Sequence, residues 1–187
     1  MTLLEMKKKV LGLIEELNPG NENLTDDPDI ATKINDVINM VMFELARMKK
    51  IPKYIEMEVS EGDIIDYADI EKEGGYEVYQ LSNIGGVGYD LKAQGTIIKV
   101  KESGTLEIDY FVYPERITDK TNAKGYEFEL TPDVLEIMAY GVAADLLKSD
   151  VSTEYGSIYA TRYESMKQQL DPRFMMGNIS IEGGVNI

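Results

Sequence analysis

Hydrophobic residues in the first fifty positions recur every three or four residues, which is the period of an amphipathic helix. One such stripe covers 3–17 and is followed by the turn residues 18–20. A longer stripe covers 30–48 and follows Asp27 and Pro28, which suit a helix N-cap and the first helical position. The sequence therefore predicts two helices in this part of the chain.

From residue 54 the hydrophobic positions alternate with polar ones, which is the period of a β-strand with one buried face. Between two of these runs, Glu102, Ser103 and Gly104 form a short turn sequence that suits a hairpin. The alternation predicts strands at 54–60, 76–81, 96–101, 106–113 and 126–130. We therefore expect a small antiparallel β module over 54–130.

Helical periodicity returns at Thr131 and Pro132, which again suit an N-cap and the first helical position. This third helix is expected to run to Lys148, and its small residues leave one side open to a neighbouring helix: Ala139, Gly141, Ala143 and Ala144. A fourth helix is expected from a cap at Ser152 to Leu170.

The order of these elements predicts an α+β fold in which four helices form one core. The antiparallel β module is expected as an insertion between the second and third helices, with an extended C-terminal tail after the fourth. The expected divisions are the N-terminal helices of the core, the inserted β module, the C-terminal helices of the core and the tail, at 1–53, 54–130, 131–173 and 174–187.

Composition removes much of the chemistry that enzymes use. The chain of 187 residues has no Cys and no His, so the common zinc sites, thiolate nucleophiles and Ser-His-Asp triads cannot be built. Its net charge of −15 argues against broad binding to nucleic acid. No stretch approaches the roughly 20 apolar residues of a membrane span. We therefore expect no cofactor, no metal, no membrane contact and a protein that is not an enzyme.

Acidic residues are most concentrated in the predicted β module. Nine of them lie between residues 56 and 77: Glu56, Glu58, Glu61, Asp63, Asp66, Asp69, Glu71, Glu73 and Glu77. They could form a DNA-mimicking surface or a calcium site, or a solvated strand edge that resists pairing with other chains. The calcium-loop pattern D-x-[DN]-x-[DN]-G is absent, which favours the solvated edge.

Two further patterns carry little chemical information. Glu107 and Asp109 share one face of a predicted strand and could imitate a glycosidase pair, but such pairs arise by chance in so acidic a chain. The glycine-rich segment 84–88 lacks the spacing of phosphate-binding loops and predicts a turn.

Two segments are candidates for protein contacts. Tyr155, Tyr159 and Tyr163 are spaced four residues apart on the fourth helix, where they form either a core stripe or an interface. The tail combines exposed anchors with a strand-like strip that could join another chain's sheet. Its candidate interface residues are Arg173, Phe174, Met175, Met176, Ile179 and Ile181.

The stretch LTPDVLEIMAYGVAADLL at 130–147, followed by a helix with spaced tyrosines, resembles the head-to-tail connector (adaptor) proteins of tailed bacteriophages. The two-helix start and the inserted strand region agree with this resemblance. It implies a structural virion protein that forms a homo-oligomeric ring, usually a dodecamer, docks on the portal protein and extends the DNA channel.

The same resemblance implies tail or neck proteins as further partners, and DNA that passes through the channel without sequence-specific binding. It places the protein in the neck or connector region of the virion, and in the host cytoplasm before assembly. The alternatives are another neck or tail-end virion protein, or an acidic DNA-mimic inhibitor of a nucleic-acid-binding enzyme.

Overall fold

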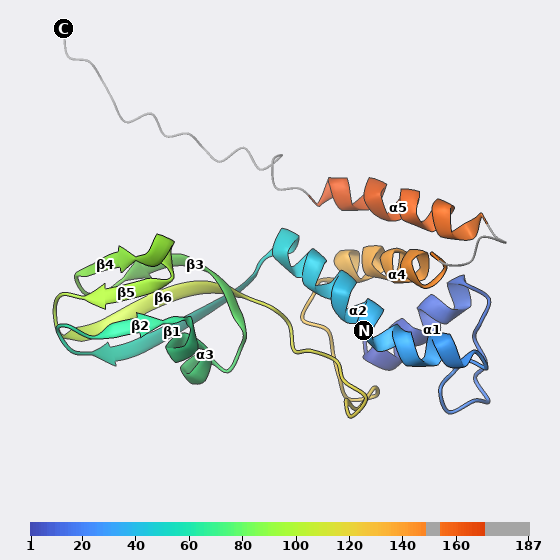
Figure 1. Cartoon of the computed structure of the whole chain (residues 1–187), viewed down its shortest axis with the longest axis horizontal. Coiled ribbons are helices and arrows are strands. Elements are labelled where there is room, and N and C mark those ends of the chain that lie inside the picture. Colours follow the sequence, from blue (N-terminus) through green and yellow to red (C-terminus); the bar gives the residue numbers. More distant parts are fainter. Residues whose placement is uncertain (149–153, 171–187) are drawn as a thin grey trace, which may run out of the picture.

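The computed structural model describes residues 1–148 and 154–170. Within these residues the fold is α+β, with five α-helices and two three-stranded antiparallel sheets (Figure 1). The helices are α1 (Leu3–Leu13), α2 (Pro28–Lys49), α3 (Tyr67–Gly74), α4 (Pro132–Leu146) and α5 (Tyr155–Gln169). The strands are β1 (Ile51–Val59), β2 (Ile64–Asp66), β3 (Val78–Gly85), β4 (Tyr89–Lys92), β5 (Ile97–Val100) and β6 (Gly104–Val112), with a short 3₁₀ turn at Ala93–Gly95.

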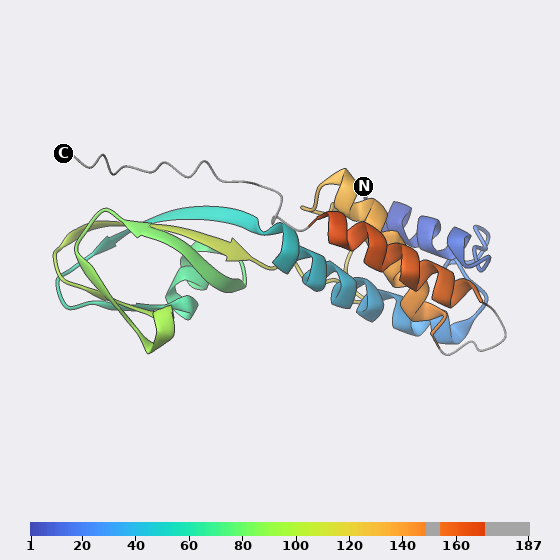
Figure 2. The same cartoon turned by 90° about the horizontal axis from the view of Figure 1, so that it is seen from above.

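The molecule is elongated and has two parts (Figures 1 and 2). Helices α1, α2, α4 and α5 lie together at one end, and the strands with α3 lie at the other. We call residues 51–112 the β unit and the remaining described residues the helical unit. Each unit has its own cluster of buried hydrophobic side chains.

Local sequence signals explain where the helices begin. Asp27 caps α2, since its carboxylate accepts hydrogen bonds from the backbone N–H groups of Asp29 (2.8 Å) and Ile30 (3.2 Å). This confirms the N-cap predicted at the start of the second helix. Helix α1 begins with a capping box between Thr2 and Glu5, a signal that the hydrophobic pattern did not reveal.

Helix α1 ends at Leu13, although the hydrophobic pattern predicted a helix to residue 17. The backbone of Glu15 has a φ of 63°, which is the left-handed region and cannot continue a right-handed helix. Leu17 still packs against the helical core from the loop that follows. Its place in the hydrophobic stripe therefore reflected burial and not helical conformation.

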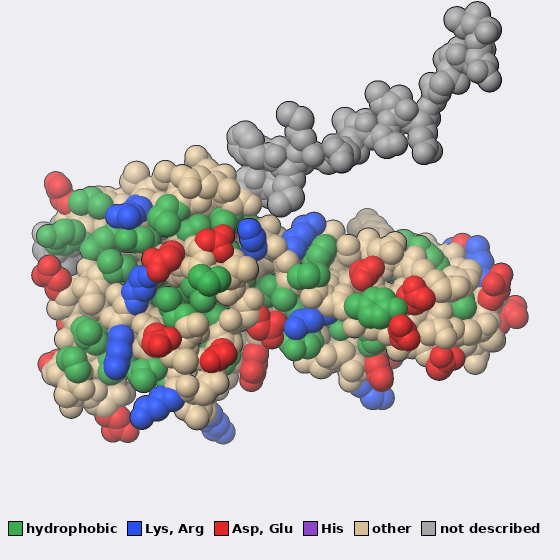
Figure 3. Space-filling view, turned by 180° about the vertical axis from the view of Figure 1, so that it is seen from behind, with side chains coloured by type: hydrophobic (Ala, Val, Ile, Leu, Met, Phe, Trp, Pro, Cys, Tyr) green, Lys and Arg blue, Asp and Glu red, His purple; other side chains and the backbone are tan. Residues whose placement is uncertain are grey.

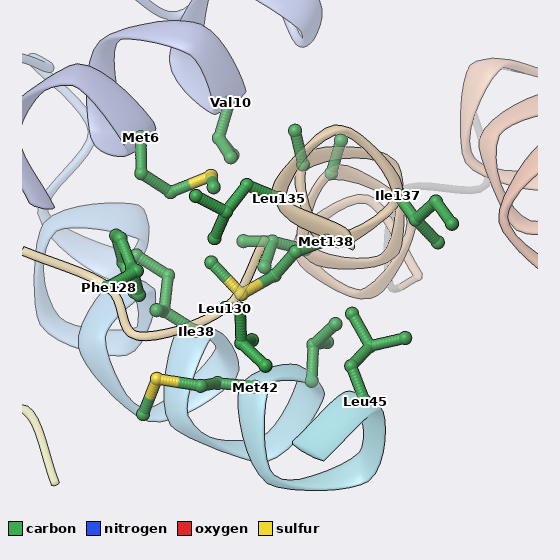
Figure 4. Close-up of a cluster of buried hydrophobic side chains, with 14 of the residues drawn as sticks. Met6, Val10, Ile38, Met42, Leu45, Phe128, Leu130, Leu135, Ile137 and Met138 are labelled. Carbon is green, nitrogen blue, oxygen red and sulfur yellow. The ribbon is translucent and has the colours of Figure 1, made fainter. Parts of the chain in front are cut away.

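The helical core is assembled from both ends of the chain (Figure 4). Met6 and Val10 of α1 meet Ile38 and Met42 of α2 around the apolar side of α4, where Leu135 is only 2% exposed. Because these residues are far apart in sequence, the core forms only when the segments before and after the β unit come together.

The β unit consists of two sheets with strand orders β1-β6-β3 and β2-β5-β4. Their inner faces share the second hydrophobic cluster, which includes the fully buried Ile98, Leu106 and Ile108. The Asp66–Asp69 capping box starts α3, and Gly75 ends it with a φ of 77°. This helix was missed because its acids were interpreted only as part of a charge cluster.

The strand predicted at 126–130 does not form. In the structure Glu127 makes one isolated bridge with Thr2, while Phe128 and Leu130 are buried in the helical core. The buried side chain of Asn39 in α2 holds the preceding part of this connection by exchanging two hydrogen bonds with the backbone of Ile117, at 2.7 and 2.8 Å. The alternation therefore reflected burial against helices, and the β strands end at Val112.

Candidate interaction surfaces

Helix α5 is fastened to α2 by a polar network beside a close helix contact. The hydroxyl of Tyr163 donates a hydrogen bond to Glu44 (2.8 Å), and the Lys167 ammonium lies 2.8 Å from the same carboxylate. Burial, followed by the hydrogen bond to Glu44, raises the pKa of Tyr163 far above its usual value. The neighbouring Gly141 of α4 leaves room for the ring, because a Cβ there would lie 2.7 Å from it.

The three candidate tyrosines of α5 have different environments. Tyr163 is buried, and the hydroxyl of the half-buried Tyr159 donates to the backbone carbonyl of Leu13 at 2.6 Å. Tyr155 is 52% exposed and stacks on Tyr159, with ring centroids 6.2 Å apart. Two of the three therefore attach α5 to the helical unit, and the third extends to the surface.

The outer side of α5 carries an apolar surface. Ile158 is 52% exposed and borders an open hollow whose described lining residues all belong to this helix: Ser157, Ile158, Thr161, Arg162, Ser165 and Met166. Exposed Tyr155 lies three residues before Ile158 and hence on a neighbouring part of the same side. This pair gives the helical unit an exposed apolar surface.

The remaining candidate interface residues, Arg173, Phe174, Met175, Met176, Ile179 and Ile181, lie outside the described residues, as does the predicted cap Ser152.

The structure separates the nine acids of 56–77 instead of gathering them into one site. Asp63 accepts a hydrogen bond from the Ser60 N–H (2.8 Å), and Glu71 accepts one from the Val78 N–H (2.9 Å). Asp66 and Asp69 cap α3. Several of these carboxylates therefore stabilise local turns and a helix end.

Glu56 and Glu58 instead join a face of the β1-β6-β3 sheet that points away from the hydrophobic cluster. Glu56 lies directly opposite Glu107, and Tyr54 lies directly opposite Asp109. We call this the outer sheet face and define it by Tyr54, Glu56, Glu58, Glu107, Asp109 and Phe111. Figure 3 shows acidic side chains gathered around an exposed hydrophobic one over the β unit.

Negative charge acts strongly on the one exposed tyrosine of this face. A hydrogen bond to Glu56 (2.7 Å) and the nearby carboxylates of Glu107 and Asp109 raise the pKa of Tyr54 to about 12. The Asp109 carboxylate also lies 3.5 Å from the side-chain amide of Asn83. The sequence-predicted pair Glu107 and Asp109 thus shares a face of β6, as the alternation indicated.

The glycine-rich segment 84–88 completes β3 with its first two residues and forms the predicted turn to β4 at 86–88. Gly86 has a φ of 86°, and a Cβ there would lie 2.1 Å from the Thr105 carbonyl oxygen. The glycine therefore allows close packing against β6, and the turn does not lead into a helix N-terminus.

Sequence reasoning missed a pocket at the junction of the two units. This junction pocket has a volume of about 460 Å³ and is lined by Met40, Phe43, Glu44, Arg47, Glu77, Tyr113 and Arg116. The Arg47 guanidinium lies 5.2 Å from the Tyr113 ring centroid and also donates to the Tyr113 hydroxyl. The Arg116 guanidinium lies 4.9 Å from the Phe43 ring centroid. The lining residues of the junction pocket come from distant segments of the chain, so no local sequence motif could have indicated this pocket.

Among residues 1–148 and 154–170, no cluster of three or more His, Cys, Asp or Glu side chains could hold a metal ion. None of the helices in the described part of the chain is both long and apolar enough to cross a membrane. In comparisons with known proteins, neither a family model nor a curated protein sequence matches this chain.

Proposed function

We propose that this chain is a structural virion protein, a subunit of the head-to-tail connector (adaptor) ring of a tailed bacteriophage. In this proposal the ring docks on the portal protein, extends the DNA channel and provides the platform for tail attachment. The finer architecture belongs to the same proposal: α1, α2, α4 and α5 form a four-helix core, and the β unit is its insertion. The sequence resemblance over 130–170 suggests this function.

The observation that carries the proposal is the two-sided character of α5. Its inner side is fixed to the helical unit by Tyr159 and Tyr163, whereas Tyr155 and Ile158 are exposed on the surface. A rigid helix with exposed apolar side chains suits a contact between neighbouring subunits, because little conformational freedom is lost on binding. A head-to-tail contact of this kind closes into a ring when the rotation between copies permits.

The charge of the chain agrees with a role around DNA that must move. Residues 51–112 carry 13 acidic and 5 basic side chains. A channel lined by such a surface would repel phosphate groups and let DNA pass without adhering.

The proposal is tested by isolating a tagged copy from cells that produce the complete particle and measuring the mass of its complex. Twelve copies of a 21.0 kDa chain would form a ring of about 250 kDa, recovered with the portal protein. A chain that stays monomeric in those cells would contradict the proposal.

A matched pair of variants tests the role of α5. Ile158→Ser removes an exposed apolar side chain of α5 and is expected to abolish the ring, whereas Ile64→Ser removes an even more exposed one (64%) from the β unit and should leave the ring intact. Equal effects of the two variants would argue against the α5 contact.

A DNA-mimic inhibitor remains a second candidate because Glu56 and Glu107 expose adjacent negative charges on one sheet face. In that case the same isolation would recover one basic enzyme in a small complex. Reversing charge at Glu56 and Glu107 would then weaken binding, and added salt would weaken it steeply.

A further inference from the structure

The outer sheet face and the adjoining junction pocket form one surface with carboxylates at one end and cations at the other. Along β6 the outward residues are Glu107, Asp109 and Phe111, and Tyr113 continues the alternation just beyond the strand. The face therefore changes from carboxylates at one end to aromatic rings, and the rings lead directly to the junction pocket.

The aromatic centre is continuous. The ring of Tyr79 stacks on Phe111 at 6.3 Å and lies 4.9 Å from Tyr113, which in turn lies 5.2 Å from Phe43 of α2. Tyr79 also donates a hydrogen bond to the Ala46 carbonyl (3.2 Å), which fixes this centre to the end of α2. Aromatic residues, Met and Arg are enriched in the buried centres of protein interfaces, and this region contains all of them.

The helix-proximal end carries three cations beside two pocket carboxylates, Glu77 and Glu44, of which Glu44 is paired with Lys167. Lys50 lies 4.7 Å from the Phe111 ring centroid, and Arg47 and Arg116 lie against the rings of Tyr113 and Phe43. None of these three cations forms an ion pair within the part of the chain that the structure describes. These ring contacts position the two guanidinium groups and leave most of their N–H donors available for a carboxylate.

The opposite end has uncompensated negative charge. Glu56 of β1 lies directly opposite Glu107 of the neighbouring strand β6. Two like charges in this arrangement destabilise a sheet when no cation is nearby. Among the described residues, neither carboxylate forms an ion pair. A guanidinium placed between them would remove this repulsion.

We propose that the outer sheet face and the junction pocket together form a two-fold interface with a second copy of this chain. In this arrangement Glu107 and Asp109 of each copy lie over Arg47 and Arg116 of the other, and the aromatic centres pack against each other. A two-fold contact requires a self-complementary surface, and a surface with opposite charges at its two ends provides one.

The area of the outer sheet face sets the expected affinity of the dimer. Three strands about 4.8 Å apart, over about 20 Å from Glu107 to Tyr113, cover less than the roughly 800 Å² per partner of a standard interface. The dimer is therefore expected to be weak, with a Kd in the micromolar range, and sensitive to salt. This interface does not depend on the proposed connector function, because it uses the β unit and the end of α2 and not the exposed side of α5.

Sedimentation velocity of the purified full chain tests the interface. At about 100 μM protein and low salt the chain should sediment as a dimer, and about 1 M salt should return it to the monomer. The double variants Arg47→Glu/Arg116→Glu and Glu107→Lys/Asp109→Lys should each be monomeric. As a matched control, Glu61→Lys/Glu73→Lys changes the net charge equally with two exposed acids outside this face and should remain dimeric.

Mixing the two monomeric variants provides the decisive result. In a two-fold contact the mixture restores both pairs of opposite charges, so a mixed dimer should form although neither variant dimerises alone. A wild-type monomer at low salt, or a mixture that stays monomeric, would overturn the proposal.

If the arginine variant fails to fold by circular dichroism, Arg47→Gln/Arg116→Gln replaces it and should weaken the dimer at least tenfold. Loss of this dimer with an intact ring in particle-producing cells would separate the two proposals.

Discussion

The helical unit and the β unit differ in how far along the chain their cores reach. The buried cluster of the β unit draws only on residues between Ile55 and Val112. The buried members of the helical cluster extend from Leu3 to Tyr163 and include no residue between Ala46 and Ile117. The β unit can therefore form its core locally, whereas the helical core must close over a long intervening segment.

The units also differ in their net charge and in how their charged side chains are paired. Residues 51–112 have a net charge of −8, whereas the other 125 residues together have −7. In the helical unit, three lysines are paired with acids on neighbouring helices: Lys9 with Glu136, Lys49 with Asp133 and Lys167 with Glu44. In the β unit, Glu56 lies directly opposite Glu107, and neither carboxylate forms an ion pair with a cation among the described residues. The ion pairs of the helical unit therefore stabilise helix packing, whereas the carboxylates of the outer sheet face are free to pair with a partner.

The largest expected effect tests the separation of the two cores. Leu135→Ala in the helical unit and Leu106→Ala in the β unit each create a cavity and should lower the free energy of unfolding by about 2–5 kcal/mol. Hydrogen exchange followed by mass spectrometry should show faster exchange mainly in the unit that carries the substitution. Equal acceleration in both units for both variants would mean that the molecule has a single cooperative core.

A smaller effect tests the attachment of α5. Gly141→Ala places a Cβ 2.7 Å from the Tyr163 ring and 2.9 Å from Val41, so it should cost about 1–3 kcal/mol by overpacking. Gly12→Ala in α1 is the matched control, because no atom lies within 4 Å of its Cβ, and it should stabilise the chain by about 0.5–1 kcal/mol. Thermal unfolding monitored by circular dichroism measures both, and a stabilising Gly141→Ala would contradict the close contact.

The smallest effect tests the charge contrast. Glu107→Gln removes the repulsion from Glu56 and should raise the free energy of unfolding by about 0.2–1 kcal/mol in dilute, low-salt solution. The gain should shrink as salt is added, because screening weakens the interaction that the variant removes. Urea denaturation at two salt concentrations measures this difference. A loss of stability would show that this carboxylate has a favourable partner.

Local patterns identified most of the elements. The N-caps Asp27 and Thr131, each followed by proline, located the starts of two helices, and alternation located β1, β5 and β6. These features depend on neighbouring residues only, so the sequence carries them directly. The alternation at 126–130 was misleading because a segment packed against helices buries every second side chain just as a strand does.

The candidate sites depended much more on the tertiary structure. The sequence placed Tyr155, Tyr159 and Tyr163 on one helix, but only packing against α2 and α1 decided that two of them are used internally. The junction pocket joins α2 to residues 113–116 and Glu77, so its arginines and rings meet only after the β unit has folded.

The sequence by itself determined the α+β composition, the order of the four helices of the helical unit and of the longer strands, and the excess of acidic charge in the middle of the chain, because periodicity and composition are local properties. The tertiary structure alone decided which charges face one another and which apolar side chains are left exposed. Those outcomes depend on strand register and helix packing, which bring together residues from distant parts of the chain.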